Sequence, residues 1–407
     1  MKAKAGNRYA VLAAGMAVQL CTGIIYMWSV FQKFLVEQRG LDAAQVTFVF
    51  SVMLAMFVVG IVVGGRIQDK RGPRIVVFFG SLLFGVGMFL TSFVFDASPV
   101  FIYLFYGVMA GFGVGAAYNT SISCAQKWFM DKRGFATGMI VCAFGFSVVI
   151  FTPLANSLLK AYDAPATFRI FSIAFLVICL SASALIKNPP EGYVPKGYTP
   201  PAAGPAKQGL RPSEMLRTPQ FYFLTLSMMF ITPSYFILNP LLMILGEARG
   251  LGELAMLGVM ITGIASSSGR LIAPWISDKI GRKATILGLA AITLLSVVVL
   301  ISAHRVLFLA MIALVAFAYG GTSGVYPAFT SDLYGTKYAG ANYGCVMVGF
   351  GASAIIFPFI STAVNTAGAA SGDYTLSFII AAATCIVAAI MVSCVKLVRK
   401  KGLEAGK

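Results

Sequence analysis

The sequence predicts an all-α integral membrane protein whose twelve transmembrane helices form two pseudo-symmetric bundles of six. Three observations carry this prediction. The 407 residues are 58% hydrophobic and only 11% charged, with a mean hydropathy of +0.86, which is too apolar for a soluble domain. Twelve apolar runs each have the ~20 residues that a helix needs to span a bilayer. Short motifs of the first half also recur, in the same order, in the second half.

The apolar runs fall into two sets of six, separated by a stretch rich in proline, glycine and lysine. The twelve runs lie near 9–36, 43–65, 75–95, 100–126, 135–160, 168–187, 219–246, 254–276, 284–302, 306–330, 341–366 and 374–396. The N-terminal segment has no cleavage site before the first long run, so we expect a membrane span there rather than a removed signal. We therefore predict an N-terminal bundle over 1–187, an extended linker over 188–218, and a C-terminal bundle with a short basic tail over 219–407.

The basic residues are unevenly divided between the two sides of this predicted topology. Of the 31 lysines and arginines, 24 fall at the N-terminus, in alternate loops starting with the one between the second and third spans, or in the tail. The opposite loops hold only Lys33, Arg39, Lys160, Arg169, Arg249 and Arg305. Because basic loops stay on the cytoplasmic side, we expect both termini and the linker to be cytoplasmic. The net charge of +17 then reflects topology, and no basic patch interleaved with aromatic residues indicates a nucleic-acid partner.

Three motifs show that the two halves repeat one another. EQRGL at 37–41 returns as EARGL at 247–251, and DKRGPR at 69–74 returns as DKIGRK at 278–283. At an offset of 206, Gly134, Gly138, Phe144, Gly145, Ser147 and Phe151 correspond to Gly340, Gly344, Phe350, Gly351, Ser353 and Phe357. Motifs in the same order and orientation indicate a tandem duplication of a six-helix unit. Membrane carriers use such parallel repeats around a central site, about which the two halves rock.

One arginine is predicted to lie well inside a membrane span. Arg270 precedes Asp278 by eight residues, which places it about 12 Å from the charged end of its helix. Ser267, Ser266 and Thr262 fall three, four and eight residues before it, on the same helical face. A snorkelling arginine that reaches the interface is the alternative. The polar stripe favours an arginine that faces a water-filled cavity and binds an anion there.

The acidic residues offer this arginine no partner in the predicted spans. All fourteen fall in loops or at helix ends. A buried unpaired cation is costly, so the natural partner of Arg270 is a substrate carboxylate held by the two-pronged guanidinium. One cation favours one negative charge on the substrate and disfavours cationic compounds.

Polar and aromatic residues in other spans are further candidates for this cavity. Tyr118 and Asn119 follow the glycine-rich GFGVG at 111–115 and could donate hydrogen bonds to a carboxylate or hydroxyl; packing and interhelical hydrogen bonding are their alternative roles. Phe144 and Phe350 occupy equivalent repeat positions and are expected to form apolar walls. The remaining aromatic candidates, for which core packing is the alternative, are Tyr26, Trp28, Tyr319 and Tyr326.

The two charged turns are expected to act as gates rather than as substrate sites. We expect Asp69, with Arg74, and Asp278, with Arg282, to pair with basic loop residues such as Arg133 or with a helix N-terminus. Such contacts would hold the cytoplasmic side closed and re-form in each cycle.

The sequence resembles the major facilitator superfamily. GGRIQDKRGPR at 64–74 fits the signature turn GxxxD(R/K)xGxR of that superfamily, and the second copy departs from it because Pro274 replaces the leading glycine. More narrowly, five segments are similar to the oxalate/formate antiporter family and its bacterial monocarboxylate-transporter relatives: GNRY at 6–9, QKWFMDKRGFATG at 126–138, MLRTPQFY at 215–222, SDKIGR at 277–282 and NYG at 342–344.

The resemblance implies the major facilitator fold and carboxylate transport across a bacterial inner (plasma) membrane. The family has a tyrosine near the substrate at the position of Tyr118, and aromatic residues that help to enclose the substrate at Tyr26 and Tyr319. Its oxalate transporters hold the second carboxylate with a lysine where this chain has Phe350. We therefore expect a small monocarboxylate such as L-lactate or pyruvate rather than oxalate.

The coupling of transport is open between two mechanisms. Animal monocarboxylate transporters, more distant relatives, carry an aspartate where this chain has Ser266, so a protein carboxyl that carries the proton is in doubt. Proton-coupled symport is the first expectation, with the proton as co-substrate travelling with the substrate or on a water-linked tyrosine. The alternative is carboxylate exchange of the oxalate/formate type, which needs no proton site.

Other classes of function are disfavoured. The spans contain no nucleophile–base pair, acidic cluster or metal-binding histidines, so an integral-membrane enzyme is not expected. Seven cysteines without CxxC spacing and the single His304 indicate no metal site, and no cofactor is expected. A transporter-derived sensor would usually carry a soluble signalling module, and the tail is too short for one. A monomer in the bilayer is the default.

Overall fold

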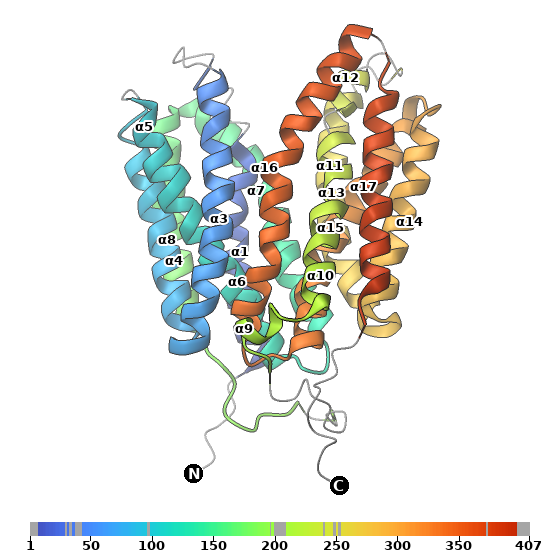
Figure 1. Ribbon diagram of the computed structural model, residues 1–407. Helices are drawn as coiled ribbons and strands as arrows, with labels where there is room; N and C mark the ends of the chain where they lie inside the picture. Colours follow the sequence, from blue (N-terminus) through green and yellow to red (C-terminus); the bar gives the residue numbers. More distant parts are fainter. Residues whose placement is uncertain are drawn as a thin grey trace.

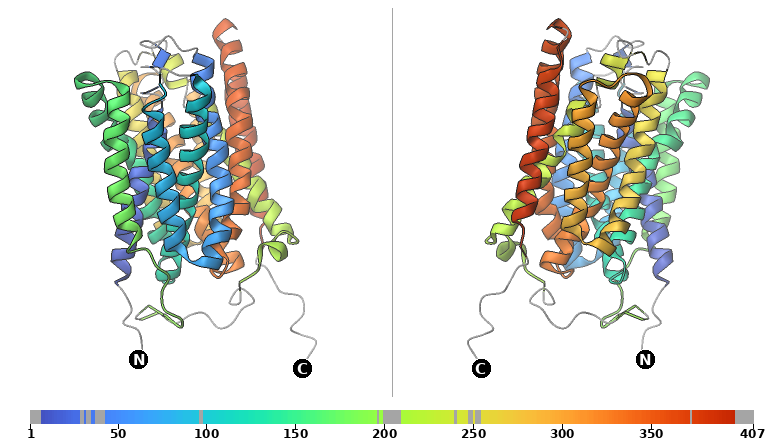
Figure 2. Two further views of the ribbon diagram at one scale, coloured as in Figure 1. Left: turned by 90° about the vertical axis from the view of Figure 1, so that its left-hand side faces the viewer. Right: turned by 90° about the vertical axis from the view of Figure 1, so that its right-hand side faces the viewer.

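The computed structural model describes residues 7–28, 31, 35–36, 43–95, 98–195, 197–198, 209–238, 241–246, 250, 254–371 and 373–396. Every regular element within these residues is a helix, and the long helices form two groups that diverge toward one end of the molecule (Figure 1). In two further views the long helices run between the same two ends (Figure 2). The EQRGL repeat at 37–41, most of its copy at 247–251, Lys33, Arg39 and Arg249 lie outside the described residues, as do 199–208 of the linker and 397–407 of the tail.

The N-terminal bundle contains six membrane-length segments. Its elements are α1 (Arg8–Thr22) continued by the 3-10 helix η1 (Gly23–Met27), α3 (Ala43–Arg71), α4 (Pro73–Thr91), the short α5 (Pro99–Ile102) continued by the π-helix η2 (Tyr103–Ala110) and α6 (Gly111–Trp128), α7 (Arg133–Ala161) and α8 (Ala164–Ser183). Each of the six segments is long and apolar enough to cross a membrane.

The C-terminal bundle repeats this arrangement after the short helix α9 (Pro212–Met215). Its elements are α10 (Pro219–Ile231) with α11 (Pro233–Leu238) and α12 (Leu241–Gly246), α13 (Leu254–Ile280), α14 (Arg282–Leu300), α15 (Arg305–Tyr334), α16 (Ala339–Ser371) and α17 (Thr375–Cys394). Five further membrane-length segments come from these helices, and α13, which packs between α15 and α7, completes the second set of six. The predicted class, an all-α membrane protein of twelve transmembrane helices in two bundles, is confirmed.

Equivalent glycines shape the turn that follows the second helix of each bundle. Gly72 and Gly281 have φ angles of +89° and +91°, a left-handed conformation that side chains with a Cβ rarely adopt. Each glycine ends its helix, and α4 or α14 begins at the next residue. The two DK turns of the sequence therefore have the same backbone geometry in both halves.

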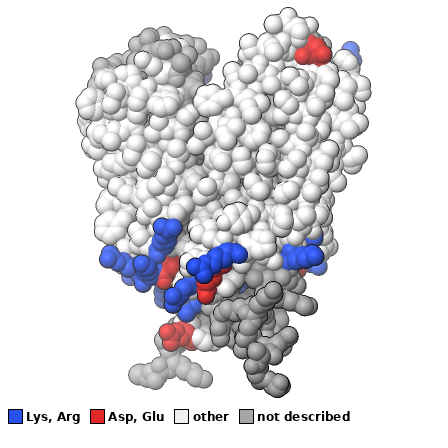
Figure 3. Space-filling model, viewed as in Figure 1, with Lys and Arg blue, Asp and Glu red and all other residues white. Residues whose placement is uncertain are grey.

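Charged side chains gather at one end of the molecule, the end at which α1 begins and α17 ends; we call it the basic end. Figure 3 shows lysines and arginines there, a belt without charge above them, and a notch between the two bundles at the opposite, far end. Arg71, Arg133, Arg282 and Lys283 all lie at helix ends on the basic side. An uncharged belt between charged ends fits a molecule surrounded by a bilayer.

The two bundles meet along two equivalent helix pairs, α7 with α13 and α3 with α16. We call these pairs the α7–α13 seam and the α3–α16 seam. A Cβ on Gly138 would lie 2.9 Å from the carbonyl oxygen of Arg270, and a Cβ on Gly344 would lie 3.1 Å from the carbonyl oxygen of Ile61. Arg270 and Ile61 themselves correspond at the offset of the DK turns, 209 residues. Glycine therefore permits the same close helix approach in both seams.

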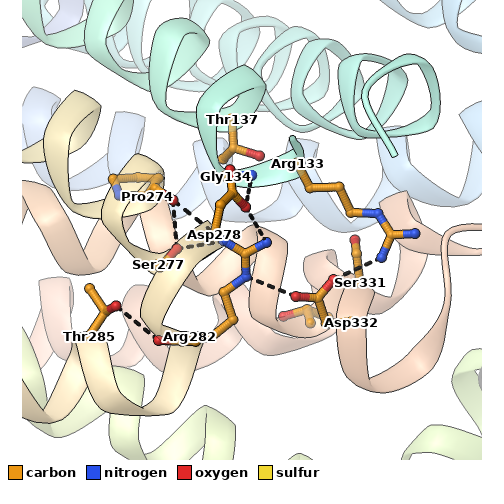
Figure 4. Close-up of polar contacts among 12 residues, drawn as sticks. Arg133, Gly134, Thr137, Pro274, Ser277, Asp278, Arg282, Thr285, Ser331 and Asp332 are labelled. Carbon is orange, nitrogen blue, oxygen red and sulfur yellow. Dashed lines mark hydrogen bonds and ion pairs between the residues drawn. The ribbon is translucent and has the colours of Figure 1, made fainter. Parts of the chain in front are cut away.

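At the basic end, each seam is closed by an aspartate that accepts hydrogen bonds from the N-terminus of a helix in the other bundle. Asp278 of α13 accepts from the backbone N–H groups of Gly134 and Phe135 in α7, both at 2.9 Å (Figure 4). Asp69 of α3 accepts from Ala341 N–H in α16, also at 2.9 Å. A helix N-terminus carries partial positive charge, so a carboxylate there is stabilised. The sequence left open whether these aspartates pair with basic loop residues or with a helix N-terminus, and the structure shows the contact with a helix N-terminus in both seams.

The basic residues predicted to join these contacts are arranged differently. Arg133 pairs with Asp332 of α15 at 2.8 Å rather than with Asp69 or Asp278. Arg282 bridges Asp278, at 2.7 Å, and Asp332, at 2.8 Å, so one acidic residue that the sequence analysis missed joins both arginines (Figure 4). Asp69 is instead approached by Lys127, at 3.7 Å. Arg74 is exposed and belongs to no ion pair within the described residues.

Replacing Asp278 by alanine should loosen the start of α7. Hydrogen bonds to a charged acceptor contribute about 1.5–3 kcal/mol, so we expect the amides of Gly134 and Phe135 to exchange with deuterium roughly tenfold faster or more. Hydrogen–deuterium exchange read by mass spectrometry on the peptide that begins α7 would measure this.

Asp373→Ala is the matched control, because Asp373 accepts from the N–H of Thr375 at the start of α17, away from the seams. It should leave exchange at the start of α7 unchanged. Unchanged exchange there in Asp278→Ala would show that the contact does not close the seam.

Candidate functional site

A cavity of about 20 Å³ lies between the two bundles, around Arg270. The N-terminal bundle contributes Tyr26, Phe57, Tyr118 and Phe144, and the C-terminal bundle contributes Met228, Arg270, Tyr319, Ser323, Tyr343, Met347 and Phe350. This space has room for about one water molecule. The lining contains one charged residue and no carboxylate.

Arg270 is buried, with 4% of its surface exposed. Its guanidinium lies over the ring of Tyr26, with Cζ 5.5 Å from the ring centroid. The nitrogens Nε and Nη1 are buried and have no hydrogen-bond partner, and no ion pair among the described residues includes Arg270. A side chain held between the bundles does not fit the alternative of an arginine that snorkels to the interface. Its unpartnered donors can form hydrogen bonds to an anion.

Aromatic rings of the N-terminal bundle enclose one side of the cavity. Phe144 of α7 packs edge-on against Tyr26 of η1, with ring centroids 5.4 Å apart, and against Tyr118 of α6 at 5.0 Å. Phe57 of α3 lies 5.3 Å from Tyr118 and 6.3 Å from Phe144. The four rings support one another, so none of them is free to turn without its neighbours.

The C-terminal bundle covers the other side with a second aromatic group. Tyr319 of α15 stacks on Tyr235 of α11 with ring centroids 4.2 Å apart and an angle of 6° between the rings. Phe236 lies 6.0 Å from Tyr319 and 6.4 Å from Phe350 of α16. The Ser323 hydroxyl donates to the Tyr319 carbonyl at 3.0 Å, so it is satisfied within α15. Apart from Arg270, Ser323 and the phenol groups, the side chains that line this side are apolar.

Tyr26 and Tyr235 follow equivalent breaks in the first helix of each bundle, 209 residues apart. In the first bundle α1 gives way to a 3-10 segment at Gly23, where a Cβ would overlap the backbone of Phe144. In the second, Pro233 follows the end of α10 and cannot donate the next helical hydrogen bond. The same irregularity therefore places one tyrosine from each half close to Arg270.

Four sequence candidates do not line the cavity. Asn119 donates from Nδ2 to the carbonyl oxygens of Ile61, at 3.0 Å, and Gly340, at 2.7 Å, so it joins α6 to α3 and α16 and has the bridging role rather than the ligand role. The Tyr326 hydroxyl shares a hydrogen bond of 2.8 Å with Ser227 inside the C-terminal bundle. Trp28 donates to the Val46 carbonyl and stacks on Tyr106. Ser266 lies where α13 crosses α15 at Gly320.

The structure brings together Arg270, Tyr26, Tyr118, Tyr319, Phe144 and Phe350, and it adds residues that sequence reasoning missed. Tyr343, a lining residue, lies in the NYG motif. Tyr235 is not part of the lining but stacks on Tyr319, and it could have been found from the repeat position of Tyr26. The other added lining residues are Phe57, Met228, Ser323 and Met347. Apolar and small residues of this kind are common throughout the spans, so no pattern in the sequence distinguishes them.

Comparison with known proteins identifies the family. The family model described as Major Facilitator Superfamily matches residues 11–358, with a further match over 275–406. The chain belongs to the major facilitator superfamily. It is therefore a membrane transporter and not an enzyme, as its sequence predicts.

Several relatives within this superfamily share about a quarter of the sequence over most of its length. The oxalate:formate antiporter of Oxalobacter formigenes is 28% identical over 94% of this chain and 90% of its own length. Monocarboxylate transporter 13 of Bos taurus is 27% identical over 92% of this chain and 85% of its own length. Apicoplast pyruvate carrier 1 of Toxoplasma gondii is 23% identical over 81% of this chain and 71% of its own length. The predicted resemblance to the oxalate/formate antiporter family is confirmed.

Solved structures agree on the fold. A bacterial homologue of the iron transporter ferroportin, in an outward-facing state, matches with a TM-score of 0.74 at 14% identity, covering 95% of this chain and 98% of that one. A major facilitator transporter in the outward conformation matches with a TM-score of 0.70, also at 14% identity, covering 95% and 99%. The predicted major facilitator fold is therefore confirmed.

Tyr118 and Asn119 are neighbours in α6, but Tyr118 lines the cavity and Asn119 joins helices by hydrogen bonds. Substitutions of the two residues test this difference. Asn119→Ala removes one hydrogen bond within the N-terminal bundle and one between the bundles. Each contributes about 1 kcal/mol, so the change should lower the unfolding temperature by about 2–4 °C or more. Tyr118→Phe removes only a hydroxyl at the cavity and should change it less. Thermal unfolding of the two purified variants, monitored by intrinsic fluorescence, would measure this. A lower unfolding temperature for Tyr118→Phe than for Asn119→Ala would contradict the assignment.

Proposed function

We propose that this transporter carries small monocarboxylates, such as L-lactate or pyruvate, by alternating access, with Arg270 binding the carboxylate. The observation that carries the proposal is a buried guanidinium with two unpartnered nitrogens in a cavity between the bundles. A carboxylate can accept charge-assisted hydrogen bonds from such donors and replaces the missing counterion. The relatives support the same class, because they include an oxalate:formate antiporter, a monocarboxylate transporter and a pyruvate carrier.

One negative charge on the substrate fits this site better than two. Arg270 is the single charged residue in the cavity lining, and Phe350 occupies the position of the family's second cation. A second carboxylate would have to lose its water against aromatic rings and methionines without a compensating cation. Phe350 thus sets a preference for monoanions.

A three-carbon anion needs more room than the one water that the cavity can hold, so the walls must move when it binds. Met228 and Met347 have flexible side chains that can make room at low cost. The larger movement is a rocking of the bundles about the two seams. Asp278 on the start of α7, and Asp69 on the start of α16, hold the basic end closed in one half-cycle and must release it in the other.

Charge distribution supports one orientation in the membrane. Most of the lysines and arginines that the structure describes lie at the basic end, and basic segments are retained in the cytoplasm. The basic end is therefore the cytoplasmic side, with both termini there, in a bacterial inner membrane. The protein works as a monomer in this proposal, because each site is built within a single chain.

We propose proton-coupled symport as the first mechanism of coupling. Anion exchange is the alternative, and the composition of the cavity lining supports considering it. None of the lining residues is an aspartate, glutamate or histidine, and Ser266 stands where animal relatives have an aspartate. In symport the proton would travel with the substrate or on a tyrosine such as Tyr26. In exchange, an unpaired Arg270 would disfavour the return of the empty carrier, so that each inward anion requires an outward one.

Arg270→Lys should lose most transport although the charge is kept, because a point-like ammonium cannot reproduce the two-pronged contact. We expect labelled L-lactate uptake into proteoliposomes to fall about tenfold or more. In the wild-type protein, excess acetate or formate should compete with lactate, whereas oxalate should compete poorly.

Arg169→Lys provides the control, because Arg169 lies over the ring of Phe93 rather than in the cavity. Its uptake should match that of the wild type. Normal uptake by Arg270→Ala, at equal protein level, would overturn the binding role of Arg270.

Uptake of labelled L-lactate under an imposed inward proton gradient, with no anion inside the vesicles, separates the two forms of coupling. Symport predicts uphill accumulation that collapses when a protonophore is added. Exchange predicts uptake only into vesicles preloaded with formate, acetate or another carboxylate. If the folded protein, with an unchanged unfolding temperature in the vesicles, shows neither proton-driven accumulation nor exchange, it is not a lactate transporter.

A further inference from the structure

A groove of about 280 Å³ is formed by residues of α1, α7 and α13, and we call it the lateral groove. Met16 and Leu20 line it from α1, Met139 and Phe146 from α7, and Leu271 from α13. Every lining side chain is that of a methionine, alanine, leucine, cysteine or phenylalanine. None of these side chains carries an oxygen or nitrogen atom, so a polar ligand would lose its water there without compensation.

The lateral groove opens on the outside of the molecule and not toward Arg270. Phe144 of α7 lines the cavity around Arg270, whereas Phe146 lines the groove. Two residues are about 200° apart around an α-helix, so these two rings point to opposite sides of α7. On α1, the groove residues Met16 and Leu20 are partly exposed. The groove therefore lies on the surface that faces the bilayer.

The lateral groove lies deep in the membrane. Its residue Ala17 follows Arg8, the first residue of α1, by nine positions, which is about 14 Å along the helix. Arg8 pairs with Asp131 at the basic end, at 2.9 Å. Since the hydrocarbon core of a bilayer is about 30 Å thick, the groove is near the middle of that core.

A groove with this lining and at this depth is suited to hydrocarbon. A water molecule in such a space needs about two to four polar partners, and the lining side chains supply none. An apolar cavity of about 150 Å³ can hold benzene, so the lateral groove has room for several methylene groups. An empty groove would forfeit the dispersion contacts of its lining atoms. The bilayer that surrounds the groove supplies acyl chains, which match its chemistry.

The equivalent place in the C-terminal bundle is closed by direct helix packing. Ala143, another lining residue, corresponds to Gly349 of α16 at the offset of 206, and Met16 corresponds to Thr225 of α10 at the offset of 209. A Cβ on Gly349 would overlap the carbonyl oxygen of Thr225, so α10 and α16 meet through their backbones. The groove is thus a particular feature of the first bundle and not a general result of the repeat.

We propose that the lateral groove binds one acyl chain of a membrane phospholipid, and that this chain contacts both bundles at once. Leu271 belongs to the C-terminal bundle, whereas the other lining residues belong to the N-terminal bundle. At this level α7 and α13 are in close contact, since a Cβ on Gly138 would lie 3.1 Å from the carbonyl oxygen of Leu271. A chain in the groove therefore packs against both sides of the α7–α13 seam.

This position gives the bound chain an effect on conformation. When the bundles rock, α13 moves relative to α7, and Leu271 moves relative to the rest of the groove. Lipid tails are as apolar as the lining, so a chain that fits the groove stabilises the present arrangement through packing alone. The inference rests on membership of the major facilitator superfamily and not on the proposed substrate.

The test uses a phosphatidylcholine that carries a photoactivatable diazirine in the middle of one acyl chain. Increasing amounts are added to the purified full-length protein in detergent, and the labelled peptides are identified by mass spectrometry after illumination. We expect labelling that saturates on peptides from both bundles, on α7 between Met139 and Phe146 and on α13 at Leu271. Labelling near Leu295 and Val298, which are exposed on α14, should instead rise in proportion to the added lipid.

Two substitutions of Ala17 and one matched control test the position of the chain. Ala17→Phe fills the groove from α1 and should lower the saturable labelling about tenfold, because the chain would overpack the remaining space. Ala17→Leu fills less of the groove and should lower the labelling by a smaller factor. Leu226→Phe is the control, because Leu226 of α10 corresponds to Ala17 at the offset of 209 and is 38% exposed. It should leave the labelling unchanged.

Saturable labelling of both bundles that Ala17→Phe removes and Leu226→Phe keeps, at unchanged unfolding temperatures, supports the proposal. If Ala17→Phe fails to fold, a partial loss in Ala17→Leu supports it in the same way. Labelling at the groove that rises in proportion to the lipid, as on α14, overturns the site, and saturable labelling confined to α1 and α7 overturns the contact with both bundles. Absence of labelling at the groove also overturns the proposal, and a dimeric mass of the same sample by light scattering would then assign the groove to a second copy of the chain.

Discussion

The guanidinium of Arg270, buried without a counterion, is the constraint on which the rest of the site depends. A cation in such surroundings is costly unless fixed dipoles, aromatic faces or a ligand replace its water. The protein surrounds it with the ring of Tyr26, other phenols and the hydroxyl of Ser267, and offers it no carboxylate from the lining. Its position also restricts its neighbours, because α7 can lie against it only where residue 145 is glycine. Binding chemistry and helix packing are therefore set by the same side chain.

The aspartate contacts at the basic end follow a different pattern from the cavity around Arg270. They repeat in both seams, since Asp69 and Asp278 occupy equivalent turns and each accepts hydrogen bonds from a helix in the opposite bundle. The ion pairs around them break this symmetry. Arg282, Arg133 and Asp332 form a connected network in one seam, whereas in the other seam Lys127 is the one cation that pairs with Asp69 within the described part of the chain. The duplication thus preserved the contacts that use the backbone and allowed the side-chain ion pairs to diverge.

Much of this architecture could be predicted from the sequence because membrane spans and repeats leave strong, local signals. Hydropathy and spacing predict the positions of the spans and the two bundles. They also place Arg270 inside its span, and the positions of the acidic residues show that it has no carboxylate partner there. Contacts between helices left weaker signals. The sequence allows Asn119 to be a ligand, whereas in the structure its amide donates to the carbonyl oxygens of Ile61 and Gly340. Such distinctions depend on side-chain direction at a helix crossing, which sequence spacing fixes only to within part of a turn.

The asymmetry between the two seams has a consequence for how a bound anion moves. Arg270, the proposed anion-binding residue, belongs to α13, while the α3 position that corresponds to it is Ile61. In the proposed mechanism a bound anion therefore moves with the C-terminal bundle as the two bundles rock. In that mechanism, release on either side of the membrane breaks the same contacts to Arg270, and the gradients across the membrane set the direction of net flux.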